Sequence, residues 1–207
     1  MSWDPYLDLQ SGVLRNRLGI TDKAELAQAE AELTSYRLIE LRLNPLPGCY
    51  DLVHLQGFHR YIFGDVYDWA GELRTVSIGK GQPFCLPQHL VSFAGEVFGQ
   101  LAREGYLRGL GRAAFVDRLT ALLADVNALH PFREGNGRTQ RAFLAQLARD
   151  AGYRVRWAAM DAEVNVAAAA AAHRGDNRLL RAMLEELVEA PGAAAPAPPQ
   201  PWVPPER

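Results

Sequence analysis

The chain has 207 residues, which suits a single domain with a tail and is long enough to bury a hydrophobic core. Hydrophobic residues make up 48% and charged residues 22% of the chain, the balance of an ordinary globular protein. The formal net charge of -2 leaves no basic footprint over the chain as a whole, so direct binding to nucleic acid is not expected.

The sequence contains no recognisable targeting peptide and no cysteine motif. Residues 1–12 are polar and resemble neither a signal peptide nor a transit peptide, and no apolar run approaches the length of a membrane span. Cys49 and Cys85 form no CxxC pair, and we interpret them as free thiols. We therefore expect a cytoplasmic protein without membrane contact, and export by a specialised secretion system stays open.

The first predicted element is a helix that begins near Asp22. Asp22 followed by Glu25 resembles a capping box. Apolar residues then recur at helical spacing, at Leu26, Ala29, Leu33 and Tyr36. The sequence LNPLPG ends this helix, because two prolines and a glycine cannot continue it. The same spacing predicts three more helices, over about residues 52–62, 90–101 and 112–128.

Residues 73–84 interrupt the helical pattern. LRTVSIGKGQPF alternates apolar and polar residues and contains a Gly-Lys-Gly turn, which predicts a short β-hairpin. A lone hairpin in a helical protein needs a surface to pack on. It is either a surface loop with a function or a plain connector, and both interpretations stay open.

Three helices are predicted after residue 137. One covers residues 138–151 and ends at Gly152, one includes the alanine run Ala167–Ala172, and a last one is marked by Leu179, Met183 and Leu187. From about Ala190 the composition is mainly alanine and proline, which is typical of a flexible tail. The chain is therefore predicted to be all-α, a helix bundle with one short hairpin.

The sequence HPFREGNGRTQR, residues 130–141, lies between two predicted helices. Gly135, Asn136 and Gly137 feed a helix whose first N–H groups have no partner inside the helix, so this loop can cradle a phosphate. Arg138 and Arg141 are three residues apart and share a helix face, which suits a polyphosphate. Each residue alone could be a turn residue or a solvated charge, but together they favour a site.

Two more residues complete this set. Glu134 lies beside the cradle, where a carboxylate suits Mg²⁺ bound between it and phosphate oxygens. His130 lies at the mouth of the loop and can take a proton from a hydroxyl near neutral pH. The set indicates transfer from a nucleoside triphosphate to a hydroxyl, a reaction in which positioning and electrostatics do most of the catalysis.

The run from residue 130 to 141 matches the Fic motif, HxFx(D/E)GNGRxxR, at every specified position. Residues 63–76 resemble the segment that leads into the Fic flap hairpin, and residues 77–84 resemble the flap. Residues 18–33 resemble the N-terminal helix of small class I bacterial Fic toxins. The chain thus resembles the Fic family over roughly residues 4–188.

The resemblance implies a mainly helical Fic fold in a single domain. This Fic domain would cover residues 1–189, with a core at about 50–188 and an N-terminal helical extension at 1–49. Residues 190–207 would form the Ala/Pro-rich flexible tail outside it.

The resemblance also implies a role for each motif residue. His130 would deprotonate the target hydroxyl, and Glu134 would hold Mg²⁺ between the α- and β-phosphates of ATP. The anion hole and the phosphate-binding arginines would be Gly135, Asn136, Gly137, Arg138 and Arg141. In the flap, Ile78, Lys80, Gly81 and Phe84 would hold the target segment by strand-like pairing. Lys80 and Gly81 would also edge the nucleotide pocket.

The implied activity is that of a protein adenylyltransferase, which moves AMP from ATP to a tyrosine, serine or threonine hydroxyl. A kinase branch of the family departs from GNGR, whereas this chain keeps Gly137. Phosphorylation, UMP transfer or phosphocholine transfer on the same scaffold stay as alternatives. So does an inactive nucleotide-binding or target-binding module. A structural helical adaptor would leave the Gly-rich loop and the paired arginines unexplained.

The resemblance also implies protein partners, an antitoxin and a modified target. The antitoxin is expected because an inhibitory motif is missing. Many Fic proteins carry an inhibitory (S/T)xxxE(G/N) motif, but here Thr21 and Glu25 are followed by Leu26, and no serine or threonine occurs from Asp161 onward. The chain then resembles toxins restrained by a separate small antitoxin, whose glutamate would reach Arg141. Related toxins modify the ATPase subunits of gyrase and topoisomerase IV, which are the expected targets by resemblance.

Several other residues are interpreted as structural. His54 and His59 are five apart, which fits no common metal-pair spacing on a helix. Trp69 and Phe132 are expected in the core, and His173 has no partner that the sequence indicates.

Overall fold

The computed structural model describes residues 4–80 and 82–190 of the chain. In that part of the chain seven α-helices pack together with two short two-stranded sheets, so the all-α prediction is confirmed. No helix within these residues is long and apolar enough to cross a membrane. Gly81 lies outside the described residues, and so do residues 191–207 of the predicted tail.

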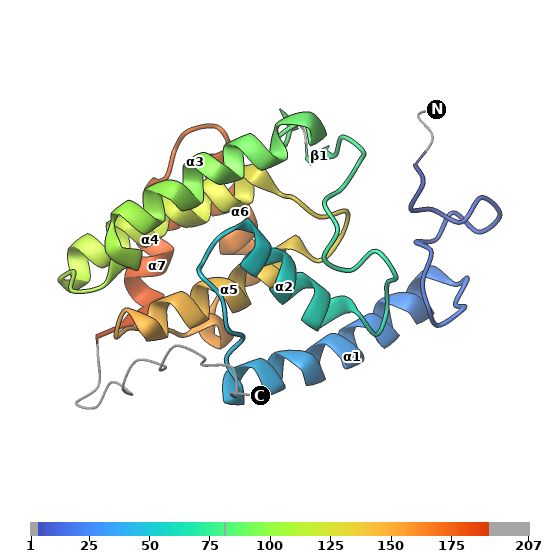
Figure 1. Ribbon diagram of the computed structural model, residues 1–207, viewed down its shortest axis with the longest axis horizontal. Coiled ribbons are helices and arrows are strands. Elements are labelled where there is room, and N and C mark those ends of the chain that lie inside the picture. The colour runs from blue at the N-terminus through green and yellow to red at the C-terminus, as the bar shows by residue number, and fades with distance from the viewer. Residues whose placement is uncertain (1–3, 81, 191–207) are drawn as a thin grey trace, which may run out of the picture.

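Every predicted helix is present. The bounds are α1 Lys23–Leu43, α2 Leu52–Phe63, α3 Leu90–Arg103, α4 Arg112–Leu129, α5 Asn136–Asp150, α6 Ala162–His173 and α7 Arg178–Leu187. In Figure 1, α3 and α4 lie side by side along one edge of the molecule, and α1 runs along the opposite edge. Helices α2 and α5 pack against each other between them, which places the start of α5 near the middle of the bundle.

Polar caps determine where several helices begin. The Asp22 carboxylate accepts hydrogen bonds from the backbone N–H groups of Ala24 and Glu25, each at 2.9 Å, which satisfies two N–H groups left open at the start of α1. Helix α5 starts two residues before the predicted Arg138, because Gly135 adopts a positive φ of 79° and turns the chain into the helix.

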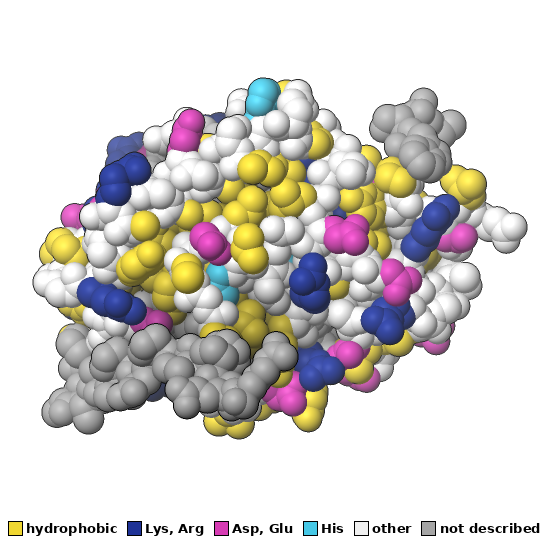
Figure 2. Space-filling model, in the orientation of Figure 1, with side chains coloured by type: hydrophobic (Ala, Val, Ile, Leu, Met, Phe, Trp, Pro, Cys, Tyr) yellow, Lys and Arg dark blue, Asp and Glu magenta, His cyan; other side chains and the backbone are white. Residues whose placement is uncertain are grey.

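The core is built from the inward faces of α2, α3, α4, α5 and α7. Trp69 and Phe132 are buried, as predicted for both. His54 and His59 are buried as well, and both contact aromatic rings of this core. Basic and acidic side chains are interspersed over the face seen in Figure 2, in keeping with the small net charge.

The hairpin is shorter than predicted. Strands β1 Gly79–Lys80 and β2 Gln82–Pro83 pair antiparallel. Residues 73–78 instead run as an irregular segment, because their backbone bonds to other elements. The N–H of Arg74 donates to the carbonyl of Pro131 at 2.9 Å, and that of Thr75 donates to the Tyr6 hydroxyl at 3.1 Å. The alternating pattern therefore does not indicate strand pairing here, and it does not follow burial either, since Arg74 is the most buried of residues 73–78.

A second pair of strands was not predicted. Strand β3 Arg154–Val155 pairs antiparallel with β4 Val188–Glu189 and joins the end of α7 to the region after α5. Two-residue strands carry too little alternation for a sequence signal. Cys49 is exposed and Cys85 is partly buried, and both are free thiols, as predicted.

Candidate active site

The α4–α5 loop starts at His130, which caps the C-terminal end of α4. Its backbone has a φ of 42° and a ψ of 59°, a left-handed conformation that is uncommon outside glycine. The Nδ1 atom lies 3.2 Å from the carbonyl oxygen of Asn127. Because a carbonyl can only accept, this bond places the proton on Nδ1 and makes Nε2 the basic atom of the neutral ring.

The flap covers one face of this imidazole. The ring of Phe84 stacks on the His130 ring with centroids 3.8 Å apart and planes 5° apart. The flap is tied to the protein behind this stack, since the N–H of Cys85 donates to the carbonyl of Ala128 on α4 at 3.0 Å. The stack fixes the ring plane of His130 relative to the flap.

The middle of the loop is held by Asn136. Its side chain accepts a hydrogen bond from the N–H of Phe132 at 2.9 Å and donates one to the carbonyl of Phe132 at 2.7 Å. With the Asn136 side chain engaged in this way and buried, its contribution to an anion hole comes from the backbone. The first N–H groups of α5 have no acceptor inside the helix, which is the arrangement that binds phosphate.

Close packing makes glycine necessary at position 135. A Cβ on Gly135 would lie 2.3 Å from the ring of Phe63, and its φ of 79° is in the left-handed region. A Cβ on Gly137 would lie 3.2 Å from a guanidinium nitrogen of Arg141. Gly137 therefore leaves room for Arg141 to lie beside the start of α5.

His59, on α2, holds the α4–α5 loop from the buried side. Its Nδ1 accepts from the N–H of Gly71 at 2.8 Å, so Nε2 carries the proton and donates to the carbonyl of Glu134 at 3.0 Å. The ring stacks on Phe132 at 3.9 Å. Burial lowers the pKa of His59 to about 4, so the ring is neutral at physiological pH. The structural role expected for His59 is therefore to hold the α4–α5 loop through the carbonyl of Glu134.

Glu134 is the acidic residue at the edge of this loop. One of its carboxylate oxygens accepts from the N–H of Gly135 at 2.9 Å, and the side chain is exposed. Within the described residues no cluster of three or more His, Cys, Asp or Glu side chains could hold a metal by itself. A single carboxylate beside a phosphate cradle nevertheless fits Mg²⁺, which commonly takes most of its ligands from phosphates and water.

The two motif arginines differ in their surroundings, because only Arg141 lines the pocket that contains His130. Arg141 lines a pocket of about 560 Å³ together with His130, Glu134 and Gly137. Burial lowers the pKa of Arg141, and the nearby charge of Arg138 adds to that effect. Of the predicted phosphate-binding residues, Asn136, Gly137 and Arg141 line this pocket, whereas Gly135 and Arg138 do not.

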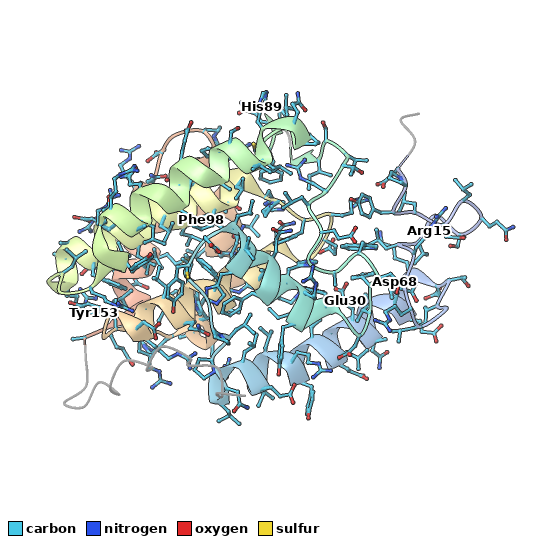
Figure 3. All side chains as sticks on the ribbon, viewed as in Figure 1. Arg15, Glu30, Asp68, His89, Phe98 and Tyr153 are labelled. Atoms are coloured by element: carbon cyan, nitrogen blue, oxygen red, sulfur yellow. The ribbon has the colours of Figure 1, made fainter. Side chains whose placement is uncertain are left out.

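Arg138 faces α1 instead. Its guanidinium pairs with Glu30, donates to the Thr34 hydroxyl at 3.1 Å, and lies 4.7 Å above the ring centroid of Phe63. Glu30 is buried and also accepts from the Tyr67 hydroxyl; it projects from α1 into the molecule, as Figure 3 shows. Sequence reasoning considered Glu25 as an internal partner for a motif arginine, but Glu25 is exposed at the start of α1.

Flap residues line the same pocket as His130. Ile78, Gly79, Gln82 and Phe84 form its wall opposite the loop. Of the other predicted flap residues, Lys80 pairs with Gln82 through its backbone, its side chain is not described, and Gly81 lies outside the described residues.

The lining residues that the sequence did not predict include polar and aromatic side chains that follow α5 in the chain. His173 and Asn165 come from α6, and Trp157 comes from a 3-10 turn, η3 Trp157–Ala159. The ring nitrogens Nε2 of His173 and Nε1 of Trp157 are buried without a hydrogen-bond partner among the described residues. Their sequence context, an alanine-rich helix and an irregular turn, carries no motif that could have indicated a site.

A second hollow, of about 490 Å³, is lined by residues of α1, of α5 and of the segment 154–159, and we call it the arginine groove. Six arginines line it: Arg42, Arg138, Arg141, Arg149, Arg154 and Arg156. Its other lining residues are apolar, and no acidic side chain lines it within the described part of the chain. Arg141 and Trp157 line both hollows, so an occupant of the groove would lie next to the pocket.

Comparisons with known proteins point to one family. The model of the Fic/DOC family matches residues 49–148. The N-terminal Fic domain of a VirB-translocated Bep effector protein from Bartonella quintana, solved with bound ADP, superposes with a TM-score of 0.85 at 26% identity. That match covers 90% of this chain and 95% of that one.

Two relatives are similar over most of this chain. The protein adenylyltransferase VbhT of Bartonella schoenbuchensis is 41% identical over 182 residues, which cover 87% of this chain and 38% of the relative. The chain thus spans about two fifths of that relative's length. A Salmonella typhimurium protein named "Probable protein adenylyltransferase Fic" is 40% identical over 186 residues, 89% of this chain and 92% of the relative. With its motif, fold and relatives in agreement, the chain belongs to the Fic/DOC family, and these relatives are named protein adenylyltransferases.

Proposed function

We propose that the protein transfers AMP from ATP to a hydroxyl side chain of a target protein. The observation that carries this proposal is the pocket in which the His130 imidazole, the start of α5 and Arg141 meet. A basic imidazole and a set of anion-binding groups in one pocket suit attack of a hydroxyl on a phosphate.

In the proposed reaction, Nε2 of His130 takes the proton of the target hydroxyl. The hydroxyl oxygen then attacks the α-phosphorus of ATP and forms a new P–O bond. The bond between the α-phosphorus and the bridging oxygen breaks, and pyrophosphate leaves with the electron pair. The N–H groups that begin α5 face the charge that develops on the α-phosphate, in a helix end prepared before substrate binds.

The remaining phosphate contacts follow the family pattern. Arg141 would bind and orient the γ-phosphate, since it lines the pocket beside Gly137. Arg138 would contribute to the β- and γ-phosphates, although in the present structure its guanidinium is engaged by Glu30. Glu134 would hold Mg²⁺, which would neutralise phosphate charge.

The flap would present the target. Its short strands leave backbone groups at the rim of the pocket, and pairing with an extended segment would bring a hydroxyl toward His130. Backbone pairing conveys little side-chain specificity. By resemblance the proposed targets are the ATPase subunits of gyrase and topoisomerase IV, which would place the reaction in the cytoplasm.

The arginine groove supports a proposal about control. An antitoxin helix with an apolar face and acidic residues would match the apolar and cationic lining of the groove, and its glutamate could reach Arg141 from there. This partner would make the protein a toxin of a toxin–antitoxin pair. Charge reversal at Arg42 and Arg149 should weaken inhibition by such a helix without lowering basal modification. If the purified chain is silent with Mg-ATP and a suitable target, restraint in trans loses its basis.

The decisive experiment for the activity is mass spectrometry of a bacterial lysate incubated with the protein and labelled ATP. The expected result is a target peptide that gains the mass of one adenylyl group at a hydroxyl residue. The His130→Ala variant is the control. A gain of phosphate, uridylyl or phosphocholine mass would contradict AMP transfer, and an equal signal with His130→Ala would contradict the assigned base.

A further inference from the structure

Arg74 is a buried cation in the segment between α2 and the flap. Its side chain is only 2% exposed, and within the described residues it forms no ion pair with a carboxylate. Buried charges are normally paired, because desolvation of a charge is costly. Burial lowers the pKa of Arg74, yet a guanidinium keeps its proton in proteins. Something must therefore compensate this charge.

The compensation comes from backbone carbonyls at the end of α4 and beside the flap. The Nε atom donates to the carbonyl of His130 at 2.8 Å, and Nη1 donates to the carbonyl of Val76 at 2.8 Å. The Nη2 atom donates to the carbonyl of Cys85 and lies 3.5 Å from that of Leu129. The last carbonyls of a helix lack partners inside it and carry partial negative charge, so a cation is stabilised there.

These contacts join two parts of the site that are far apart in the sequence. Val76 and Cys85 flank the flap hairpin on either side, so one guanidinium closes the base of the flap. The same guanidinium holds the backbone of His130, whose positive φ needs support from its surroundings. The position of the flap relative to the imidazole therefore depends on Arg74, in addition to the Phe84 stack and the bond from Cys85 to Ala128.

The phosphate cradle is fixed by other residues. Asn136 holds the loop through Phe132, and His59 holds the carbonyl of Glu134. Neither contact involves Arg74. A change at Arg74 should therefore disturb the alignment of the target with His130 while ATP binding persists.

On these grounds, and building on the proposed function, we propose that Arg74 is a positioning residue for AMP transfer. It sets the distance and orientation between the target segment on the flap and the His130 imidazole. Lysine cannot replace it, since a single ammonium on a flexible stem does not reproduce the planar fork that reaches carbonyls in several directions.

The first test is Arg74→Lys, which keeps the charge. We expect kcat to fall by about 10²-fold, the effect of misplacing reacting groups by about 1 Å, and KM for the target to rise. The Kd for Mg-ATP should stay within about twofold. A kcat near the wild-type value would overturn the proposal, and so would a parallel loss of ATP affinity, which would mean a general structural role.

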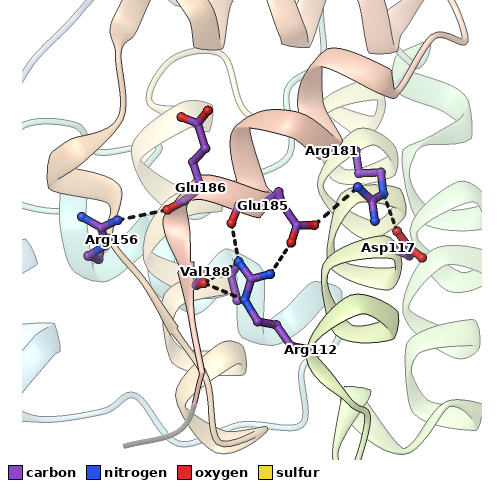
Figure 4. Close-up of polar contacts among 7 residues, drawn as sticks. All are labelled: Arg112, Asp117, Arg156, Arg181, Glu185, Glu186 and Val188. Atoms are coloured by element: carbon purple, nitrogen blue, oxygen red, sulfur yellow. Dashed lines mark hydrogen bonds and ion pairs between the residues drawn. The ribbon is translucent and has the colours of Figure 1, made fainter.

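The matched control is Arg112→Lys. Arg112 also holds backbone carbonyls, those of Glu185 and Val188, and it pairs with the Glu185 carboxylate at the far end of α4 (Figure 4). Its replacement should lower stability without a change in kcat, KM or ATP affinity. If Arg112→Lys reduces kcat as much as Arg74→Lys, the effect is not specific to the site and the proposal is wrong.

A measurement on the wild-type protein separates this proposal from the proposed function. The amide protons of Cys85 and His130 are bonded to carbonyls of α4 at the two places that Arg74 joins. Under native conditions we expect their hydrogen exchange to report one common opening, slower than that of exposed flap residues. Independent opening of the two amides would refute the proposed link between flap and His130 through Arg74, whether or not AMP transfer is found and whether or not the variants fold.

Discussion

The α4–α5 loop and the flap face each other across one pocket, but they are held in different ways. In the loop, buried side chains bond directly to the backbone, as Asn136 does to Phe132 and His59 does to Glu134. Within the described residues the flap has two short paired strands, and it is attached to the rest of the protein near its ends, through the Arg74 side chain, the Cys85 N–H and the stack of Phe84 on His130. The loop is thus fixed along its length, and the flap at its ends.

This difference matches what each part has to do. Anion-binding groups contribute most when they are in place before the substrate arrives, because they then need no reorganisation during the reaction. A segment that pairs with the backbone of a target must accept it first, and short strands with open edges allow this. Substitutions in the loop should therefore affect ATP and chemistry, and substitutions in the flap should affect the target.

The largest effect is expected at His130, which belongs to both regions. His130→Asn removes the base while keeping a residue that tolerates the left-handed backbone. AMP incorporation should fall by roughly 10³-fold or more, which is the contribution of a general base. Isothermal titration with Mg-ATP should give an affinity within about twofold of the wild-type value. Loss of ATP binding would mean that the loop is not fixed independently of His130.

The next effect is a pH dependence of stability from His59. Its pKa is about 4 in the folded protein against about 6.5 when unfolded, so the unfolded chain binds more protons between these values. The unfolding free energy should be constant above about pH 6.5 and decrease as the pH falls toward 4. The gap corresponds to about 3 kcal/mol at 1.36 kcal/mol per pKa unit.

Denaturant unfolding of the wild type and of His59→Gln over this pH range measures that contribution. Burial also lowers the pKa of His54, which adds a dependence of the same sign to both proteins. The difference between the two curves therefore isolates His59. If the curves run parallel from pH 7 to pH 4, the neutral buried ring is not what fixes the loop.

The helices and the motif could be predicted from the sequence because their signals are local. Helical spacing of apolar residues and a capping aspartate indicated α1, and twelve consecutive residues contained the loop and the start of α5. Side chains that reach the site from distant elements could not be predicted. Glu30 is 108 residues from its partner Arg138, and Arg74 is 56 residues from His130. No spacing rule connects such pairs before the fold is known.

A smaller effect is expected from Asn136, which tests the rigidity of the loop directly. Asn136→Ala removes two hydrogen bonds and leaves the N–H and carbonyl of Phe132 buried and unpaired, at a cost of about 2 kcal/mol in unfolding free energy. The affinity for Mg-ATP should decrease with it. Thr120→Val is the control, since it removes a buried hydroxyl bond within α4 away from the loop. Equal ATP affinities in the two variants would show that the loop does not depend on Asn136.

The smallest effect is expected at Phe84, where the flap contacts the loop. Phe84→Leu keeps apolar volume but removes the stack on His130, and such aromatic contacts contribute about 1 kcal/mol. We expect KM for the target to rise and kcat to fall by roughly threefold to tenfold in total. The control is Phe98→Leu, which removes a buried ring that contacts Phe143 in the core. Steady-state kinetics in which target and ATP are varied separately give kcat and the KM for each substrate. Because Asn136 and His59 hold the phosphate cradle without contacting the flap, KM for ATP should change much less than KM for the target, and equal changes would mean that the cradle and the flap act as one unit.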